Sequence, residues 1–375
     1  MKRLFLLIIA FPLALGLCSC GEEKFEPVPS TEEEARVVMT LTSDGKVYEI
    51  KYELYRALFI GNREKVDGGD TSVWSGESAS EYVNEINAII VDRAAEIYGA
   101  FHLAKSIGID PYSAEANEAV QETIGIYVHG SDSQSNNSTT VIGYGSYEKY
   151  LEALASRGMN YAVGDLMMRY SYLMGKINEY YIGEYDPALG YTGGHIQVTD
   201  EKLSEYYGGD SCVRILEAYF QEGTKTEERV EEIRNKIASE SSTSAMAAKI
   251  IQYTTSDYTE LLDSHNNPVG KIVGRYELDD FYFNEYTGAA FSVDDGEVSD
   301  IIHITDVNDS YTDGYYVLVG LSKTDSYFES YKDKIKESYV NNEIGKIIYD
   351  SESSLASGAA YLDGYSQIIH SEIVK

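Results

Sequence analysis

The sequence is poor in the residues from which disulfide frameworks and metal sites are built. Of three cysteines in 375 residues, two lie within the first twenty positions, so the body of the chain keeps only Cys212 and can form no disulfide framework. The six histidines lack the His-x-x-x-His or Cys-x-x-Cys spacing of a zinc site. They are His102, His129, His195, His265, His303 and His370. No metal or other cofactor is therefore expected.

Positive charge is also scarce. The chain has 30 Lys and Arg against 62 Asp and Glu, and its formal net charge is −32. A polyanion does not bind nucleic acid, and an anionic lipid surface would repel it. No Gly-x-Ser-x-Gly motif or phosphate-binding loop occurs, which argues against a nucleophilic enzyme. The acidic stretch "DVNDSYTDG" places Tyr311 at the sixth position, where a calcium loop needs glycine, so an acidic hairpin is favoured.

The one long apolar run lies at the N-terminus. The start "MKR" is basic, and "LFLLIIAFPLALGL" is short for a membrane helix and broken by proline, which predicts a secretory signal peptide over residues 1–19. Its end, "LCSC", resembles the lipobox of bacterial lipoproteins, in which the last cysteine is lipidated and becomes the mature N-terminus. The resemblance implies that Cys20 anchors the protein on the extracytoplasmic face of a bacterial cell membrane. Cys18 fits less well because the bulky Leu17 precedes it. The alternative is an ordinary signal peptide with incidental cysteines.

The rest of the chain divides into a mostly helical half and a mixed half. Residues 20–35 are charged and proline-bearing, which predicts a flexible tether. A hairpin is expected around Asp44-Gly45, and apolar spacing of three and four residues predicts helices over 82–107, 113–128, 146–158 and 159–181. Strands are predicted over 212–220, 296–304 and 314–323, with helices over 226–241, around 246–252 and over 327–349. The predicted class is α+β.

The order of these pieces resembles the parvulin-type foldases of the PrsA and SurA kind. "VVMTLTSDGKVYEIKYEL" and "DRAAEIYGAFHLAKSIGI" are similar to the opening hairpin and central helix of their helical chaperone domain, and "AAFSVDDGEVSDII" is close to the parvulin signature. The resemblance implies a helical chaperone-like domain over residues 36–200 and a parvulin-like domain over 201–322, with a small antiparallel sheet wrapped by helices. A C-terminal helix and tail over 323–375 would then pack back on the helical domain.

The resemblance also allows the catalytic positions of the family to be compared with the residues of this chain. Parvulins twist a prolyl amide in an apolar groove rimmed by two histidines. The resemblance places Glu217 and Tyr316 at the two histidine positions and Leu216 at the serine that precedes the first histidine. The glycine-bounded loop of the family appears as "GKIVG". The resemblance places a peptide groove at five residues: Glu217, Tyr282, Tyr286, Phe291 and Tyr316. We therefore expect peptide binding with weak or absent isomerase activity, although a register shift of one or two residues in the alignment would allow some activity to survive.

Two functions remain open at this point. The first is a membrane-anchored chaperone or foldase that binds newly exported, unfolded polypeptides. The second is a non-catalytic scaffold lipoprotein with one dedicated exported partner. The sequence leaves the identity of the clients and the oligomeric state undetermined.

Overall fold

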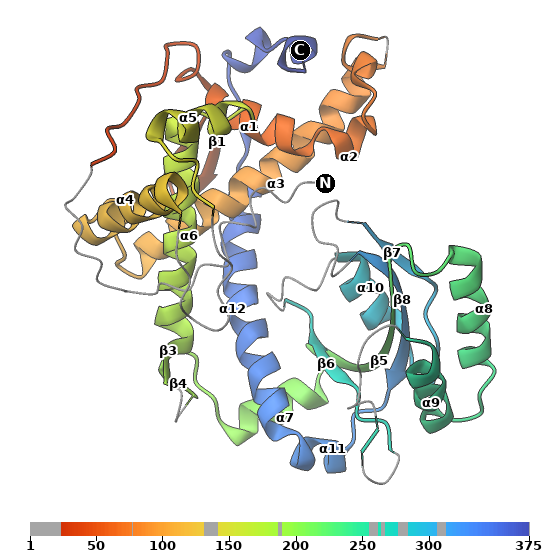
Figure 1. The fold of residues 1–375 in the computed structure, drawn as a ribbon. Helices are drawn as coiled ribbons and strands as arrows, with labels where there is room; N and C mark the ends of the chain where they lie inside the picture. Colours follow the sequence, from red (N-terminus) through yellow and green to blue (C-terminus); the bar gives the residue numbers. More distant parts are fainter. Residues whose placement is uncertain are drawn as a thin grey trace. The chain divides into compact units, whose positions relative to one another are not determined.

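The computed structural model describes residues 24–76, 78–130, 142–186, 190–254, 262–263, 267–276, 284–305 and 313–374. Two compact units make up the chain: unit 1 contains the residues up to Glu179 together with Ile348–Lys375, and unit 2 contains Tyr180–Ile347 (Figure 1). Both combine helices with small antiparallel sheets, which confirms the α+β class. No described helix is long and apolar enough to span a membrane. The predicted signal peptide and Cys20 lie outside the described residues.

Unit 1 contains a three-stranded sheet in the order β2-β1-β9. The predicted hairpin joins β1 (Val37–Ser43) to β2 (Lys46–Lys51). Its two turn residues, Asp44 and Gly45, both have positive φ angles, of 51° and 70°. Two-residue turns with positive φ at both positions match the right-handed twist of the flanking strands. The third strand, β9 (Ala360–Tyr361), pairs with β1 from the far end of the chain.

Helices form most of unit 1. They are α1 (Tyr52–Asn62), α2 (Glu64–Asp67), α3 (Ala79–Ser106), α4 (Ala114–His129), α5 (Tyr147–Ala155), most of α6 (Tyr161–Ile182), the last turns of α12 (Lys332–Ser357), α13 (His370–Ile373) and two 3₁₀ turns, η2 (Thr71–Ser75) and η3 (Tyr365–Gln367). Ser146 is the N-cap of α5, because its Oγ accepts a hydrogen bond from Lys149 N.

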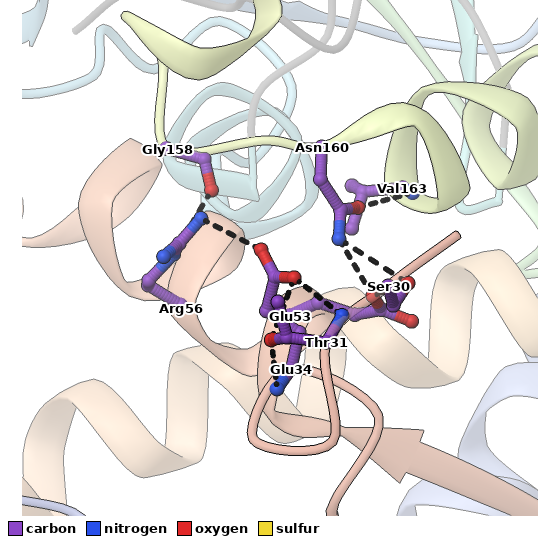
Figure 2. Close-up of polar contacts among 8 residues, drawn as sticks. All are labelled: Ser30, Thr31, Glu34, Glu53, Arg56, Gly158, Asn160 and Val163. Atoms are coloured by element: carbon purple, nitrogen blue, oxygen red, sulfur yellow. Dashed lines mark hydrogen bonds and ion pairs between the residues drawn. The ribbon is translucent and has the colours of Figure 1, made fainter. Parts of the chain in front are cut away.

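The described part of the predicted tether is packed against the rest of unit 1. Residues 24–30, which we call the strap, lie on unit 1 with Phe25 only 5% exposed. At the end of the strap, Ser30 Oγ and Asn160 Nδ2 both donate to the buried carboxylate of Glu53, as Figure 2 shows. Immediately after it, Thr31 and Glu34 form a capping-box turn in which each side chain bonds the other's backbone N–H. The prediction of a flexible tether overlooked one aromatic anchor and this buried acceptor.

Unit 2 is built on a four-stranded antiparallel sheet in the order β6-β5-β8-β7. The strands are β6 (Lys271–Gly274), β5 (Cys212–Gln221), β8 (Gly314–Leu321) and β7 (Ile302–Ile304). Helices α8 (Glu227–Ala238) and α9 (Thr243–Tyr253) pack on one face of the sheet, and α10 (Asn284–Ser292) packs on the other. A separate hairpin joins β3 (Gly183–Asp186) and β4 (Gly190–Gly193). The central strands β5 and β8 are therefore covered on both sides.

A tyrosine-rich cluster joins the remaining helices to this sheet. Tyr206 and Tyr207 of α7 (Asp200–Gly208) pack with Tyr327 of α11 (Asp325–Ser330) and Tyr339 of α12. The predicted division of the chain near residues 200 and 322 differs from the two units for this reason, since α7, α11 and the first part of α12 belong with the sheet.

Three predicted elements differ from the structure. The helix predicted over 327–349 is divided into α11 and α12 at Tyr331, whose backbone leaves helical geometry (φ −126°, ψ 30°). "GKIVG" is not a loop, because residues 271–274 form the edge strand β6. Of the strand predicted over 296–304, only residues 302–304 are a strand, since Gly296 turns the chain with φ 78°.

Candidate functional site

The residues at the parvulin catalytic positions lie on both faces of β5. Leu216 is fully buried in the cluster formed with α8 and α9, whereas Glu217 lies on the face covered by α10. Successive side chains of a strand point to opposite faces, so these two positions cannot line one pocket. Tyr316 of β8 shares the α10 face with Glu217, because Glu217 pairs with Leu318 and Tyr219 pairs with Tyr316.

A polar group surrounds Glu217 on this face. Lys271 Nζ lies 2.6 Å from Glu217 Oε2, and the Tyr286 hydroxyl donates to the same oxygen over 2.5 Å. The ammonium group also lies 4.9 Å from the centre of the Tyr286 ring. The rings of Tyr286 and Tyr316 meet edge to face at 5.5 Å, and Tyr219 packs on Tyr316 at 4.9 Å. The structure thus brings together three of the five predicted groove residues.

These three residues form a packed interior, not an open groove. Glu217 is 5% exposed, Tyr286 is 1% and Tyr316 is 7%. The fourth, Phe291, is half-buried near the end of α10, where the guanidinium carbon of Arg275 lies 4.2 Å from its ring centre. The fifth, Tyr282, lies outside the described residues. A peptide cannot reach the Glu217 carboxylate without displacing the tyrosines that cover it.

Lys271 is the member of this group that the sequence analysis missed. The resemblance predicts a loop for "GKIVG", and a loop assigns no side chain of this segment to a face of the sheet. In the structure Lys271 pairs with Ile215, which puts it on the α10 face beside Glu217. A buried carboxylate next to a lysine and a tyrosine hydroxyl is held as a hydrogen-bonded ion pair. Oε2 of this carboxylate accepts from both groups within the fold, and the arrangement differs from the two-histidine rim of the parvulins.

An open pocket of about 540 Å³ lies on a neighbouring stripe of α10. Glu285, Ala289 and Ser292 supply one wall at helical spacing, and residues 297–303 supply the other. Its apolar surface includes Ala289, Val298 and Ile301, while its rim carries acidic side chains from Glu285, Glu297 and Asp300. This pocket is distinct from the buried tyrosine face, because its lining includes neither Glu217 nor Tyr316.

His303 is a strand residue, as expected, and it lies at the edge of this pocket. Its ring stacks on Tyr315 at 4.1 Å, and its Nε2 is 2.8 Å from Glu222 Oε2. Cys212 is buried at the start of β5 with its thiol directed at Tyr206 O, at 3.4 Å. In the part of the chain that the structure describes, no three His, Cys, Asp or Glu side chains lie close enough to hold a metal ion.

Comparison with known proteins gives solved structures only. No protein-family model and no curated protein matches the chain. Similar structures include PrsA from Bacillus subtilis, at 14% identity over 86% of this chain and 93% of that one, and the foldase PrsA from Lactococcus lactis, at 14% over 90% and 98%. The peptidylprolyl isomerase PrsA from Bacillus cereus is 12% identical over 91% and 100%. All three have a TM-score of 0.24, which is too low to establish a shared fold or activity.

Proposed function

We propose that this protein is a lipid-anchored extracytoplasmic chaperone that binds newly exported, unfolded polypeptides. The proposal rests on the lipobox-like "LCSC" and on the order of sequence motifs that resembles the parvulin-type foldases. An acidic body would be repelled by anionic lipids, so a covalent anchor at Cys20 is the physical means by which it would stay at the membrane.

The observation that carries the functional part of the proposal is the buried group of Glu217, Lys271 and Tyr286. It lies on the sheet face where the resemblance places a catalytic groove, and its carboxylate is already occupied by an ammonium and a hydroxyl group. Prolyl isomerisation needs a dry, shaped pocket that accommodates the substrate amide. The packed group therefore supports the absence of isomerase chemistry at this face, and the polypeptide-binding part of the proposal rests on the resemblance to the foldases.

An aggregation assay tests the chaperone proposal. The chain without its predicted leader is mixed at equimolar ratio with an acidic enzyme that aggregates on heating, because a basic client could be kept soluble by the strong negative charge of this chain alone. We expect light scattering to fall at both low salt and 0.5 M salt, where screening leaves apolar contacts dominant. No suppression at either salt, together with tight binding to one exported protein, would establish the scaffold alternative instead.

Refolding of a proline-limited protein tests the isomerase activity separately. We expect the slow refolding phase to keep its uncatalysed rate at concentrations of this protein that suppress aggregation. A clear acceleration would show that the buried tyrosine face opens to substrate.

A further inference from the structure

The strap contacts unit 1 in the way that a bound peptide contacts its receptor. The ring of Phe25 is almost fully buried, with ring centres 5.2 Å from Tyr147 of α5 and 6.2 Å from His129 at the end of α4. The ring also lies beside Gly125 of α4, where a Cβ would be 3.7 Å from it, at ordinary van der Waals distance. Phe25 is therefore an anchor side chain held in a pocket made by two helices.

The neighbouring backbone of the strap is held by side chains of the same two helices. Phe25 N donates to Gln121 Oε1 over 2.8 Å, and Gln121 Nε2 donates to Phe25 O over 3.2 Å. The Tyr147 hydroxyl donates to Glu26 O over 2.7 Å. Burial raises the pKa of Tyr147 to about 12, so this hydroxyl remains a donor at neutral pH. The Gln121 amide bonds both the N–H and the C=O of one residue, as a neighbouring β-strand would. Such bonds recognise an extended backbone and do not depend on which side chain it carries.

The middle of the strap crosses a second surface that suits proline. Pro27, Val28 and Pro29 border a pocket of about 510 Å³ between α4 and α6. The two prolines have no backbone N–H that needs a partner, and their fixed φ angles favour an extended chain. Val28 is 45% exposed, so this part of the strap covers the pocket without filling it.

The floor of this pocket includes a neutralised ion pair. Arg169 is 8% exposed and binds Asp165 through two hydrogen bonds, of 2.7 and 3.1 Å, and it also donates to Pro111 O. Because the guanidinium is paired, the pocket presents no unbalanced charge at this point, and an uncharged proline-bearing segment fits it.

We propose that the surface of α4, α5 and α6 is a binding site for extended, proline-bearing polypeptides with an aromatic anchor, and that the strap occupies this site as an intramolecular pseudo-ligand. The inference deepens the proposed chaperone function and rests on it. Because the strap is part of the same chain, it acts at an effective concentration on the order of millimolar, so an exported client must compete with it. The site is autoinhibited until a client segment displaces residues 24–30.

A peptide-binding experiment tests this inference on the full-length mature chain. The probe is a fluorescent peptide with the sequence of residues 23–32, EKFEPVPSTE. Phe25→Ala weakens the strap, and Val47→Ala changes an exposed side chain of β2, outside the strap, as the matched control. We expect the peptide to bind the Phe25→Ala protein at least tenfold more tightly than the wild type or the Val47→Ala protein. A probe peptide with alanine at its phenylalanine should not bind.

A second variant identifies the site. Gln121→Glu keeps the size of the side chain and removes the donor to the backbone carbonyl, so in the Phe25→Ala background it should weaken binding of the peptide at least fivefold. Equal binding of the peptide to the wild-type and folded Phe25→Ala proteins, or no effect of Gln121→Glu, overturns the inference.

If Phe25→Ala does not fold, hydrogen exchange of the Phe25 amide in the wild type replaces it. Saturating peptide should then accelerate exchange of that amide, and unchanged exchange overturns the inference. The two proposals fail separately: peptide binding by the Phe25→Ala protein without suppression of aggregation contradicts the chaperone function alone, and suppression without peptide binding contradicts the strap inference alone.

Discussion

The ammonium group of Lys271 lies 2.6 Å from Oε2 of Glu217 on the sheet face covered by α10. The side chain of Glu217 is 6% exposed and that of Lys271 is 34% exposed, so the pair is buried at its acidic end and reaches solvent at its basic end. Removing one member of a buried pair leaves the other in a poorly solvated place. Single substitutions at Glu217 and at Lys271 should therefore lower the free energy of unfolding by different amounts.

Lys271→Met should destabilise unit 2 more than Glu217→Gln does. Removing the ammonium leaves the carboxylate of Glu217, whose side chain is 6% exposed, without the opposite charge of Lys271, which should cost on the order of 1–3 kcal/mol in the free energy of unfolding. Glu217→Gln should cost less, because the amide keeps an acceptor for the Tyr286 hydroxyl and the side chain of Lys271 is 34% exposed and can be hydrated. Urea unfolding measures both, and the double variant should be less destabilised than the sum of the singles. An additive double variant would show that the two groups are not coupled.

The stability of unit 1 should depend on pH through Glu352 of α12. Burial, followed by the negative charge of Glu96, raises the pKa of this carboxyl from 4.5 to about 8, and Asp92 adds to the effect while Arg93 opposes it. The folded state thus holds a proton that the unfolded chain releases above pH 4.5. The stabilisation is complete below about pH 4.5 and declines as pH rises towards about 8.

Glu352→Gln removes this decline because its amide stays neutral. Thermal unfolding is measured at pH 5, 6.5, 8 and 9. The melting temperature of the variant should rise relative to that of the wild type between pH 5 and 8, and the difference should stay constant above pH 8. The wild type and the variant keeping a constant difference over the whole range would contradict the raised pKa.

Two helical glycines should respond in opposite ways to alanine. A Cβ at Gly99 of α3 would lie 2.9 Å from Glu352 Cγ, whereas a Cβ at Gly175 of α6 meets nothing within 4 Å. Alanine is favoured over glycine inside a helix by about 1 kcal/mol, and a forced contact in a packed interface costs about 1–3 kcal/mol. Gly175→Ala should therefore raise the melting temperature and Gly99→Ala should lower it. A stabilised Gly99→Ala protein would show that Glu352 has room to move away.

Cys20 and Cys18 provide a matched pair for the lipid anchor. Cells fed an alkyne-bearing fatty acid should label the wild type and the Cys18→Ala protein, because only the cysteine after Ser19 fits the lipobox-like pattern. Cys20→Ala should lose the label and leave the membrane fraction. Persistent labelling of Cys20→Ala would assign the anchor elsewhere.

Local signals in the sequence predicted most helices and the hairpin. Amphipathic spacing gave α3 to within a few residues. The break at Tyr331 has no glycine or proline to mark it, and it depends on ring packing against Tyr327, which is a tertiary contact.

The candidate site could be predicted only in part, because it too depends on tertiary contacts. Tyrosines 286 and 316 were expected near Glu217, but burial and strand pairing decide what they do, and neither is visible along the chain. The placement of Lys271 follows only from the register of β6 against β5. The strap likewise depends on one aromatic residue in a charged stretch, where composition alone predicts a free tether.

The pairing of β1 with β9 has a consequence for how the molecule is made. Thr40 and Ala360 are partners in one small sheet, so the edge of β1 stays open until nearly the whole chain has been synthesised. Residues 180–347 form a continuous segment whose partners all emerge earlier. Vectorial delivery from the N-terminus should therefore complete unit 2 first, and the unit that carries the strap can close only when the last segment of the polypeptide arrives.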